Sequence, residues 1–156
     1  ENPVTLEGPL PPAYDAARDA YMHGLGLGTT RDMRSVEREI FLASWLSRDY
    51  TIAEKLAYWR GKFWSKRLLW RDAMMTDLRT QIRELPLPAY FLHGRHDYTV
   101  AYPLTREFVG QLQAPIKGFY TFEGSAHTPL FEEPERVLEI LRGDVRTGTT
   151  SRADPP

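Results

Sequence analysis

The character of the chain changes at Pro86, and this change limits the folds that are open to it. Before Pro86, apolar residues recur at three- and four-residue spacings, which is typical of amphipathic helices. After it come two short apolar segments, 88–94 and 116–124, with the length and aromatic content of buried strands. The segment between them, 102–112, has helical spacing. The two strands are therefore expected to be parallel neighbours joined by a crossover helix.

Two parallel strands do not make a stable sheet by themselves. A parallel sheet is normally buried on both faces and needs further strands. We therefore expect the 156 residues to be part of a larger α/β core, with the remaining strands outside this sequence. An uncovered parallel strand also presents unpaired backbone groups, which favour strand pairing, aggregation or a homodimer.

The same patterns divide the chain into four regions. Residues 1–12 hold four prolines and are expected to form an extended linker. Residues 13–85 are expected to be helical, and residues 86–142 to form β-α-β-α with a last helix beginning at Pro134. Residues 143–156 have almost no apolar side chains and are expected to be disordered.

Four helices are expected before Pro86. Thr51 is a suitable N-cap for the third, and Glu54 would complete a capping box. The expected segments are about 13–24, 32–46, 51–63 and 65–85. The glycine-rich segment 24–28 lies between two of these helices and lacks the spacing of a phosphate-binding loop, so we interpret it as a turn.

Charge and composition argue against several classes of partner. The net charge is −1, with 20 basic and 21 acidic residues, so neither nucleic acid nor an anionic membrane is an expected partner. No apolar run approaches the ~20 residues that cross a bilayer. The chain has no cysteine, which excludes disulfides and thiolate sites within it and fits a cytoplasmic protein.

Two residues with catalytic chemistry directly follow the expected strands. Asp97 follows the first, in HGRHD, and His127 follows the second, in EGSAHTP. Open α/β sheets place their ligand crevices at the carboxyl ends of such strands. A carboxylate there can orient one imidazole nitrogen and leave the other to act as a general base. A turn-forming role for Asp97 and a buried structural role for His127 are the alternatives, but their joint placement favours a catalytic pair.

These segments resemble the α/β-hydrolase family. The strand that delivers the triad acid in that family is similar to LPLPAYFLHGRHDYTV, and the strand, histidine and helix that follow are similar to FYTFEGSAHTPLFEEPERVLEIL. The helical cap of hydrolases related to proline iminopeptidases is similar to YTIAEKLAYWRGKFWSKRLLW. The resemblance implies an incomplete α/β-hydrolase, with a cap over 13–85 and the C-terminal part of the core over 86–142. It also implies that Asp97 is the triad acid and His127 the triad base.

The nucleophile of such a triad is missing from the sequence, which contains no G-x-S-x-G elbow. Ser125 lies in a GSAH loop, where a small residue suits a tight turn better than a nucleophilic role. The resemblance implies a cofactor-free serine hydrolase of small-molecule esters or peptide-like amides, completed by the missing N-terminal half of the core. Alone, the chain is expected to be inactive. The alternatives are an aspartate-nucleophile hydrolase, of the haloalkane dehalogenase or epoxide hydrolase type, and a non-catalytic interaction module.

A metal centre is a further alternative, because His93 and His96 lie close to Asp97 and His127 in the sequence or the expected fold. Strand alternation and the turn at Gly94 should point the first two histidines to different sides, and no metal-binding motif is present. We therefore expect no metal. The aromatic residues of 45–70 are expected mainly to pack between cap helices, although some of them could line an apolar substrate pocket.

Overall fold

A computed structural model of the chain describes residues 13, 17, 20–21, 29–33 and 37–155. The expected linker over 1–12, most of the first expected helix and the glycine-rich turn lie outside the described residues. Before β1, the elements in chain order are the π-helical turn η1 (Glu37–Phe41) and the helices α2 (Leu42–Leu46), α3 (Ile52–Met75) and α4 (Leu78–Gln81). They are followed by β1 (Ala89–Gly94), α5 (Tyr102–Gln111), β2 (Lys117–Phe122), α6 (Pro129–Glu132), α7 (Pro134–Ile140) and a second π-helical turn, η2 (Leu141–Val145). No helix within the described ranges has both the length and the apolar content that crossing a bilayer requires.

The capping box at the start of α3 is confirmed. Thr51 Oγ1 accepts a hydrogen bond from the Glu54 N–H at 3.3 Å, and the Glu54 carboxylate accepts one from the Thr51 N–H at 2.8 Å. The expected break between a third and a fourth helix is wrong, because α3 runs through residues 52–75 without interruption. Gly61 within it lowers helix propensity by only about 1 kcal/mol, which does not end a helix.

The expected extent of the last cap helix, to residue 85, is also wrong. Asp77 interrupts it, because its side chain accepts a hydrogen bond from the Arg79 N–H at 3.0 Å and so caps a new short helix, α4. Beyond α4, Glu84 forms an isolated parallel bridge with Gln113. Residue 84, which precedes β1, thus already pairs with the segment that leads into β2.

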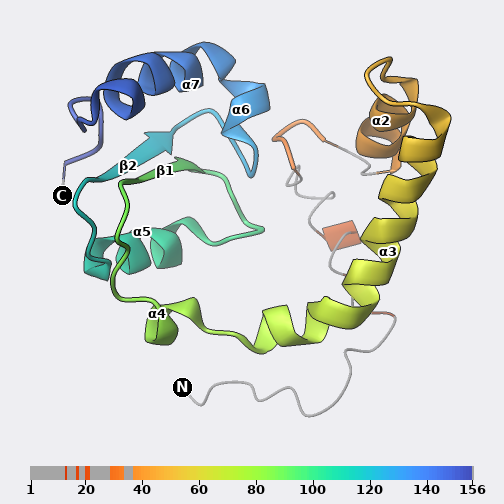
Figure 1. Cartoon of the computed structure of the whole chain (residues 1–156), viewed down its shortest axis with the longest axis horizontal. Helices are drawn as coiled ribbons and strands as arrows, with labels where there is room; N and C mark the ends of the chain where they lie inside the picture. The colour runs from red at the N-terminus through yellow and green to blue at the C-terminus, as the bar shows by residue number, and fades with distance from the viewer. Residues whose placement is uncertain (1–12, 14–16, 18–19, 22–28, 34–36, 156) are drawn as a thin grey trace.

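The two expected strands are present and pair in parallel, with Ala89 opposite Lys117 and Gly94 opposite Phe122. Helix α5 lies on one side of this small sheet and helices α6 and α7 lie on the other (Figure 1). Alternating residues of β2 supply the two halves of the core. Tyr120 and Phe122 pack with Val137 and Ile140 of α7, whereas Phe119 packs with α5. The result is a mixed α/β structure with helices on both faces of two parallel strands.

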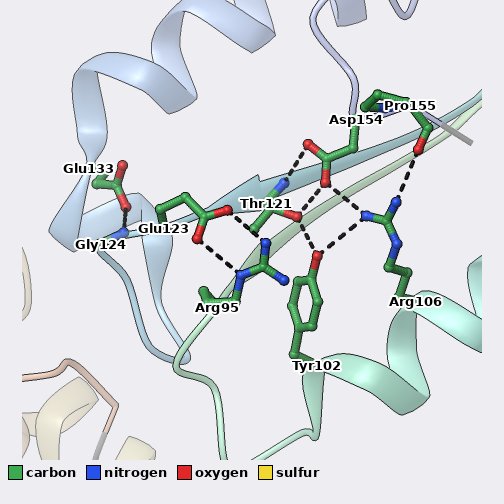
Figure 2. Close-up of polar contacts among 9 residues, drawn as sticks. All are labelled: Arg95, Tyr102, Arg106, Thr121, Glu123, Gly124, Glu133, Asp154 and Pro155. Atoms are coloured by element: carbon green, nitrogen blue, oxygen red, sulfur yellow. Dashed lines mark hydrogen bonds and ion pairs between the residues drawn. The ribbon is translucent and has the colours of Figure 1, made fainter.

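A disordered tail was expected over residues 143–156, but residues 143–155, which the structure describes, are ordered against β2. The Asp154 N–H donates to the Phe119 carbonyl at 2.8 Å, and its carboxylate accepts from the Thr121 N–H at 3.2 Å. The same carboxylate bonds the Thr121 hydroxyl and receives the Arg106 guanidinium at 3.1 Å (Figure 2). These contacts cover the edge of β2 that faces away from β1. Polar bonds order this segment, so its low apolar content was a misleading signal.

Asp144 anchors the start of this segment and is fully buried. Its carboxylate accepts hydrogen bonds from Tyr120 Oη at 2.9 Å, Ser151 Oγ at 2.6 Å and the Arg152 N–H at 2.8 Å. Burial raises the pKa of Asp144, but the hydrogen bonds from Ser151, Arg152 and Tyr120 outweigh burial and hold it well below its usual range. The ionised carboxylate is therefore the form that the fold stabilises.

Asp144→Asn is expected to destabilise the protein by about 2–4 kcal/mol, because an amide places N–H groups against donors in a buried site. Since the folded-state pKa of Asp144 is lowered, its contribution is present above the unfolded pKa of about 4 and lost as the pH falls through the folded pKa. Urea unfolding at several pH values should show that the free energy of unfolding of Asp144→Asn falls less towards acid pH than that of the unaltered protein. The exposed Asp72→Asn is the matched control. Equal stability of both variants would contradict the anchoring role.

Candidate active site

The carboxyl ends of β1 and β2 are in direct backbone contact. A Cβ atom at Gly94 would lie 1.8 Å from the Ala126 carbonyl oxygen, so only glycine fits at this position. The His96 N–H donates to the Ser125 carbonyl at 3.0 Å and holds the two loops together. The loop that carries Asp97 and the loop that carries His127 therefore form one packed unit.

Asp97 and His127 are brought into hydrogen-bond contact. His127 Nδ1 lies 2.8 Å from Asp97 Oδ2. The other carboxylate oxygen, Oδ1, accepts the backbone N–H groups of Thr99 at 2.8 Å and Val100 at 2.9 Å. The Asp97 side chain is 4% exposed and that of His127 is 38% exposed. The acid is thus buried and held by three donors, while the imidazole reaches the surface of the described structure.

The contacts define which nitrogen of the His127 imidazole carries the proton. Because an ionised carboxylate only accepts hydrogen bonds, His127 donates from Nδ1, and its neutral form carries the acceptor lone pair on Nε2. Among the described residues, none bonds to that Nε2. The hydrogen bond to Asp97 raises the pKa of His127 and outweighs its partial burial. Burial raises the pKa of Asp97, but the hydrogen bonds from His127 and Val100 outweigh burial and lower it overall.

This geometry can perform general base and acid chemistry. A neutral imidazole with a free Nε2 can accept a proton, and the adjacent carboxylate stabilises the imidazolium that results. The raised pKa keeps His127 a stronger base than a free histidine. What the described residues do not supply is a nucleophilic group at Nε2.

Two glutamates support the His127 loop, and their roles were not predicted. Glu133 Oε1 accepts the Gly124 N–H at 3.0 Å (Figure 2) and the Ser125 hydroxyl at 2.7 Å. Glu132 Oε2 accepts the Ala126 N–H at 2.8 Å. Ser125 is fully buried, which agrees with a structural role in the turn. The sequence signal was the acidic pair before Pro134, whose carboxylates reach back to the donors of the preceding loop.

The other candidate ligands do not form a metal site in the part of the chain that the structure describes. No cluster of three or more histidine, aspartate or glutamate side chains with ligand geometry occurs there. His93 is buried beside Asp97, with its Nε2 3.6 Å from the carboxylate. No described group forms a hydrogen bond with the imidazole of His96.

The segment of residues 29–33, which precedes η1, reaches the loop that carries His127. Thr128, which follows His127, donates its hydroxyl hydrogen to the Thr29 carbonyl at 2.6 Å. The Arg31 N–H donates to Glu132 at 2.6 Å, and Met33 in the same segment is buried. Residues 29–33 therefore pack against the loop that carries His127.

Some of the aromatic residues before Pro86 do pack between helices, as expected. Phe41 lies 5.8 Å from Trp45 and 4.8 Å from Trp59, measured between ring centroids. Trp59 also donates from Nε1 to Ser44 Oγ at 3.2 Å, which ties α3 to α2. In contrast, Phe63 and Trp64 are 68% and 67% exposed. Helices α2 and α3 thus share an aromatic cluster, and α3 also has exposed apolar side chains.

Comparisons with known proteins relate the chain to peptidases and esterases. It is 30% identical over 98 residues to a Bacillus subtilis protein named as a probable aminopeptidase, YbaC, covering 63% of this chain and 31% of that protein. It is 40% identical over 65 residues to proline iminopeptidase of Heyndrickxia coagulans, covering 42% of this chain and 22% of that protein. It is 23% identical over 154 residues to a Mycoplasma pneumoniae protein named as an esterase/lipase, covering 88% of this chain and 54% of that protein.

The chain therefore spans between about a fifth and about half of the length of these relatives. No family model matches it, and no solved structure matches it at the significance that these relatives reach. The resemblance inferred from the two strand segments and the cap is confirmed: the chain is related, over part of their length, to the aminopeptidases and esterases of the α/β-hydrolase family.

Proposed function

We propose that the chain supplies the cap and the acid–base pair of a serine-type α/β-hydrolase that acts on small esters or peptide-like amides. The observation that carries the proposal is the 2.8 Å contact between His127 Nδ1 and a buried, ionised Asp97. In this proposal residues 13–85 are the cap and residues 86–142 are the C-terminal part of the core. The serine nucleophile lies outside this chain.

The proposed reaction follows the geometry of the pair. The serine hydroxyl attacks the substrate carbonyl while His127 Nε2 takes its proton, and Asp97 stabilises the imidazolium without itself being protonated. His127 then donates the proton to the departing alcohol or amine, which leaves an acyl-enzyme. Water attacks that ester with His127 again as base, and the acid product departs as the serine is re-protonated.

The free edge of β1 supports the need for a further part of the core. The N–H groups of Ala89 and Arg95 donate to the segment of β2, so the backbone groups of Tyr90 and Leu92 face the opposite edge. Within the described structure, that edge has no strand beside it. We propose that a parallel strand from the missing N-terminal half of the core pairs there.

The exposed side chains of α3 support the same conclusion. Apolar residues on several sides of this helix are at least half exposed, which soluble domains rarely tolerate over a large area. They are Ile52, Leu56, Tyr58, Phe63, Trp64, Leu68, Leu69 and Met75. In Figure 1, α3 stands apart from the sheet and its helices. The missing part of the core would cover at least part of this surface.

The proposal is tested by comparing the chain alone with the chain co-expressed with the polypeptide that precedes it in the gene. p-Nitrophenyl acetate reports esterase activity and proline p-nitroanilide reports aminopeptidase activity. We expect the chain alone to give no turnover above buffer, and the combination to hydrolyse at least one substrate. Turnover by the pure chain that is lost in His127→Ala would place the nucleophile within it and contradict the proposal. Inactivity of the combination towards both substrates would also contradict it.

A further inference from the structure

A second imidazole lies against the Asp97 carboxylate and has no part in the proposed reaction. His93 is the penultimate residue of β1 and is 8% exposed. Its ring packs against Tyr102 and Phe119, with centroid distances of 5.7 Å and 6.0 Å. The two aromatic rings also contact each other, at 5.7 Å between centroids, so the buried imidazole is one of three mutually packed rings and has few orientations available.

The His93 ring closes the turn that holds the triad acid. His93 Nε2 lies 3.1 Å from the Val100 carbonyl oxygen, and because a carbonyl only accepts, His93 donates from Nε2. The N–H of the same Val100 donates to Asp97 Oδ1. Val100 is thus tied through its C=O to the strand residue before the turn, and through its N–H to the carboxylate.

The charge state of His93 suits this role. Among the described residues, the ionisable groups that face it are Asp97, His127 and the phenol of Tyr102. Burial lowers the pKa of His93, and the opposing effect of the Asp97 charge is smaller, so the ring is neutral at neutral pH. A neutral ring leaves the charge of Asp97 available to His127, whereas a protonated ring 3.6 Å from Oδ2 would compete for it.

We propose that His93 is a positioning residue, which orients the Asp97 carboxylate towards His127 by anchoring the 97–100 turn through Val100. The inference rests on the proposed function only for its effect on turnover. Without the Nε2–H donor, the Val100 carbonyl loses its partner and the turn can relax away from β1. Asp97 Oδ2 then shifts relative to Nδ1, and a misplacement of about 1 Å can cost on the order of 100-fold in rate.

The test compares His93→Leu, which removes the donor but keeps an apolar side chain, with His93→Gln, which keeps an N–H donor. Both are made in the complete protein, and NMR titration follows the pKa of His127. In His93→Leu we expect this pKa to fall towards its ordinary value and kcat to fall about 10- to 100-fold, with little change in KM. His93→Gln should restore most of the normal His127 pKa and most of the normal kcat.

A separate measurement on the unaltered protein guards against variants that do not fold. Nitrogen-15 NMR should show His93 neutral, with its proton on Nε2, at pH 7. A proton on Nδ1, or a charged ring, would overturn the inference. So would a folded His93→Leu variant in which the His127 pKa is unchanged. Because the NMR results do not depend on turnover, an inactive complete protein would count against the proposed function and not against the role of His93.

Discussion

His127→Ala in the complete protein is expected to reduce kcat by about 10⁴- to 10⁶-fold, with KM changed by no more than a few-fold. The reason is that the imidazole performs both proton transfers of the proposed reaction. Among the described residues, its only hydrogen bond is the one to Asp97. Its loss should therefore remove chemistry and leave the fold and the substrate-binding surface largely in place.

Steady-state kinetics with the better of the two chromogenic substrates measures this effect, and thermal melting checks the fold. His96→Ala is the matched control, because His96 lies beside Asp97 in the same loop and no described group bonds its imidazole. The control should retain activity within a few-fold of the unaltered protein. A His127→Ala variant with more than about a tenth of normal kcat would refute the assignment of the general base.

The site could be predicted from sequence because its determinants are local. Each strand is a short apolar run, and parallel pairing brings the ends of neighbouring strands to the same edge. Asp97 and His127, which follow those ends, were therefore expected to meet, and their side chains do lie 2.8 Å apart. Their catalytic use stays a proposal, because geometry alone does not supply the missing nucleophile.

Residues that support the site were harder to predict, because their partners are distant in the sequence or are backbone groups. Glu132 and Glu133 bond the N–H groups of the His127 loop, although helix-start patterns assign acidic residues to the helix that follows. The sequence offers His93 as a candidate metal ligand, while in the structure its ring bonds the Val100 carbonyl. Side-chain to backbone contacts of this kind leave no periodic signal.

The two larger errors have a common physical cause. The expected disorder after residue 142 followed from a lack of apolar side chains, but the segment is ordered by the buried carboxylate of Asp144 and by Asp154 on the edge of β2. The expected break near residue 64 followed from a change in the apolar stripe, but α3 has apolar side chains on several sides. Apolar periodicity locates a core only where that core is within the chain, and we propose that most of the core for α3 lies outside it.

Asp97→Asn in the complete protein is expected to lower kcat by about 10⁴-fold, because an amide can hold His127 in the wrong tautomer and cannot stabilise the imidazolium. Asp97 raises the pKa of His127, so the substitution should lower that pKa. Since the base must be neutral to act, activity falls as the pH drops through the His127 pKa. The acid limb of the kcat/KM profile should therefore move to lower pH in the variant.

The same substitution should change the pH dependence of stability in a way that identifies the pair. The pKa of folded Asp97 is lowered, so its contribution is present above the unfolded pKa and lost as pH falls through the folded value. The pKa of folded His127 is raised, so its contribution is present below the unfolded pKa and lost as pH rises through the folded value. The stability that the pair adds is thus largest between the two unfolded-state pKa values, about 4 for aspartate and about 6.5 for histidine. Urea unfolding across this window should show a maximum in the free energy of unfolding. We expect Asp97→Asn to flatten that maximum and the exposed control Asp49→Asn to leave it unchanged. If Asp97→Asn changed neither the acid limb of the kcat/KM profile nor the stability maximum, Asp97 and His127 would not act as a pair.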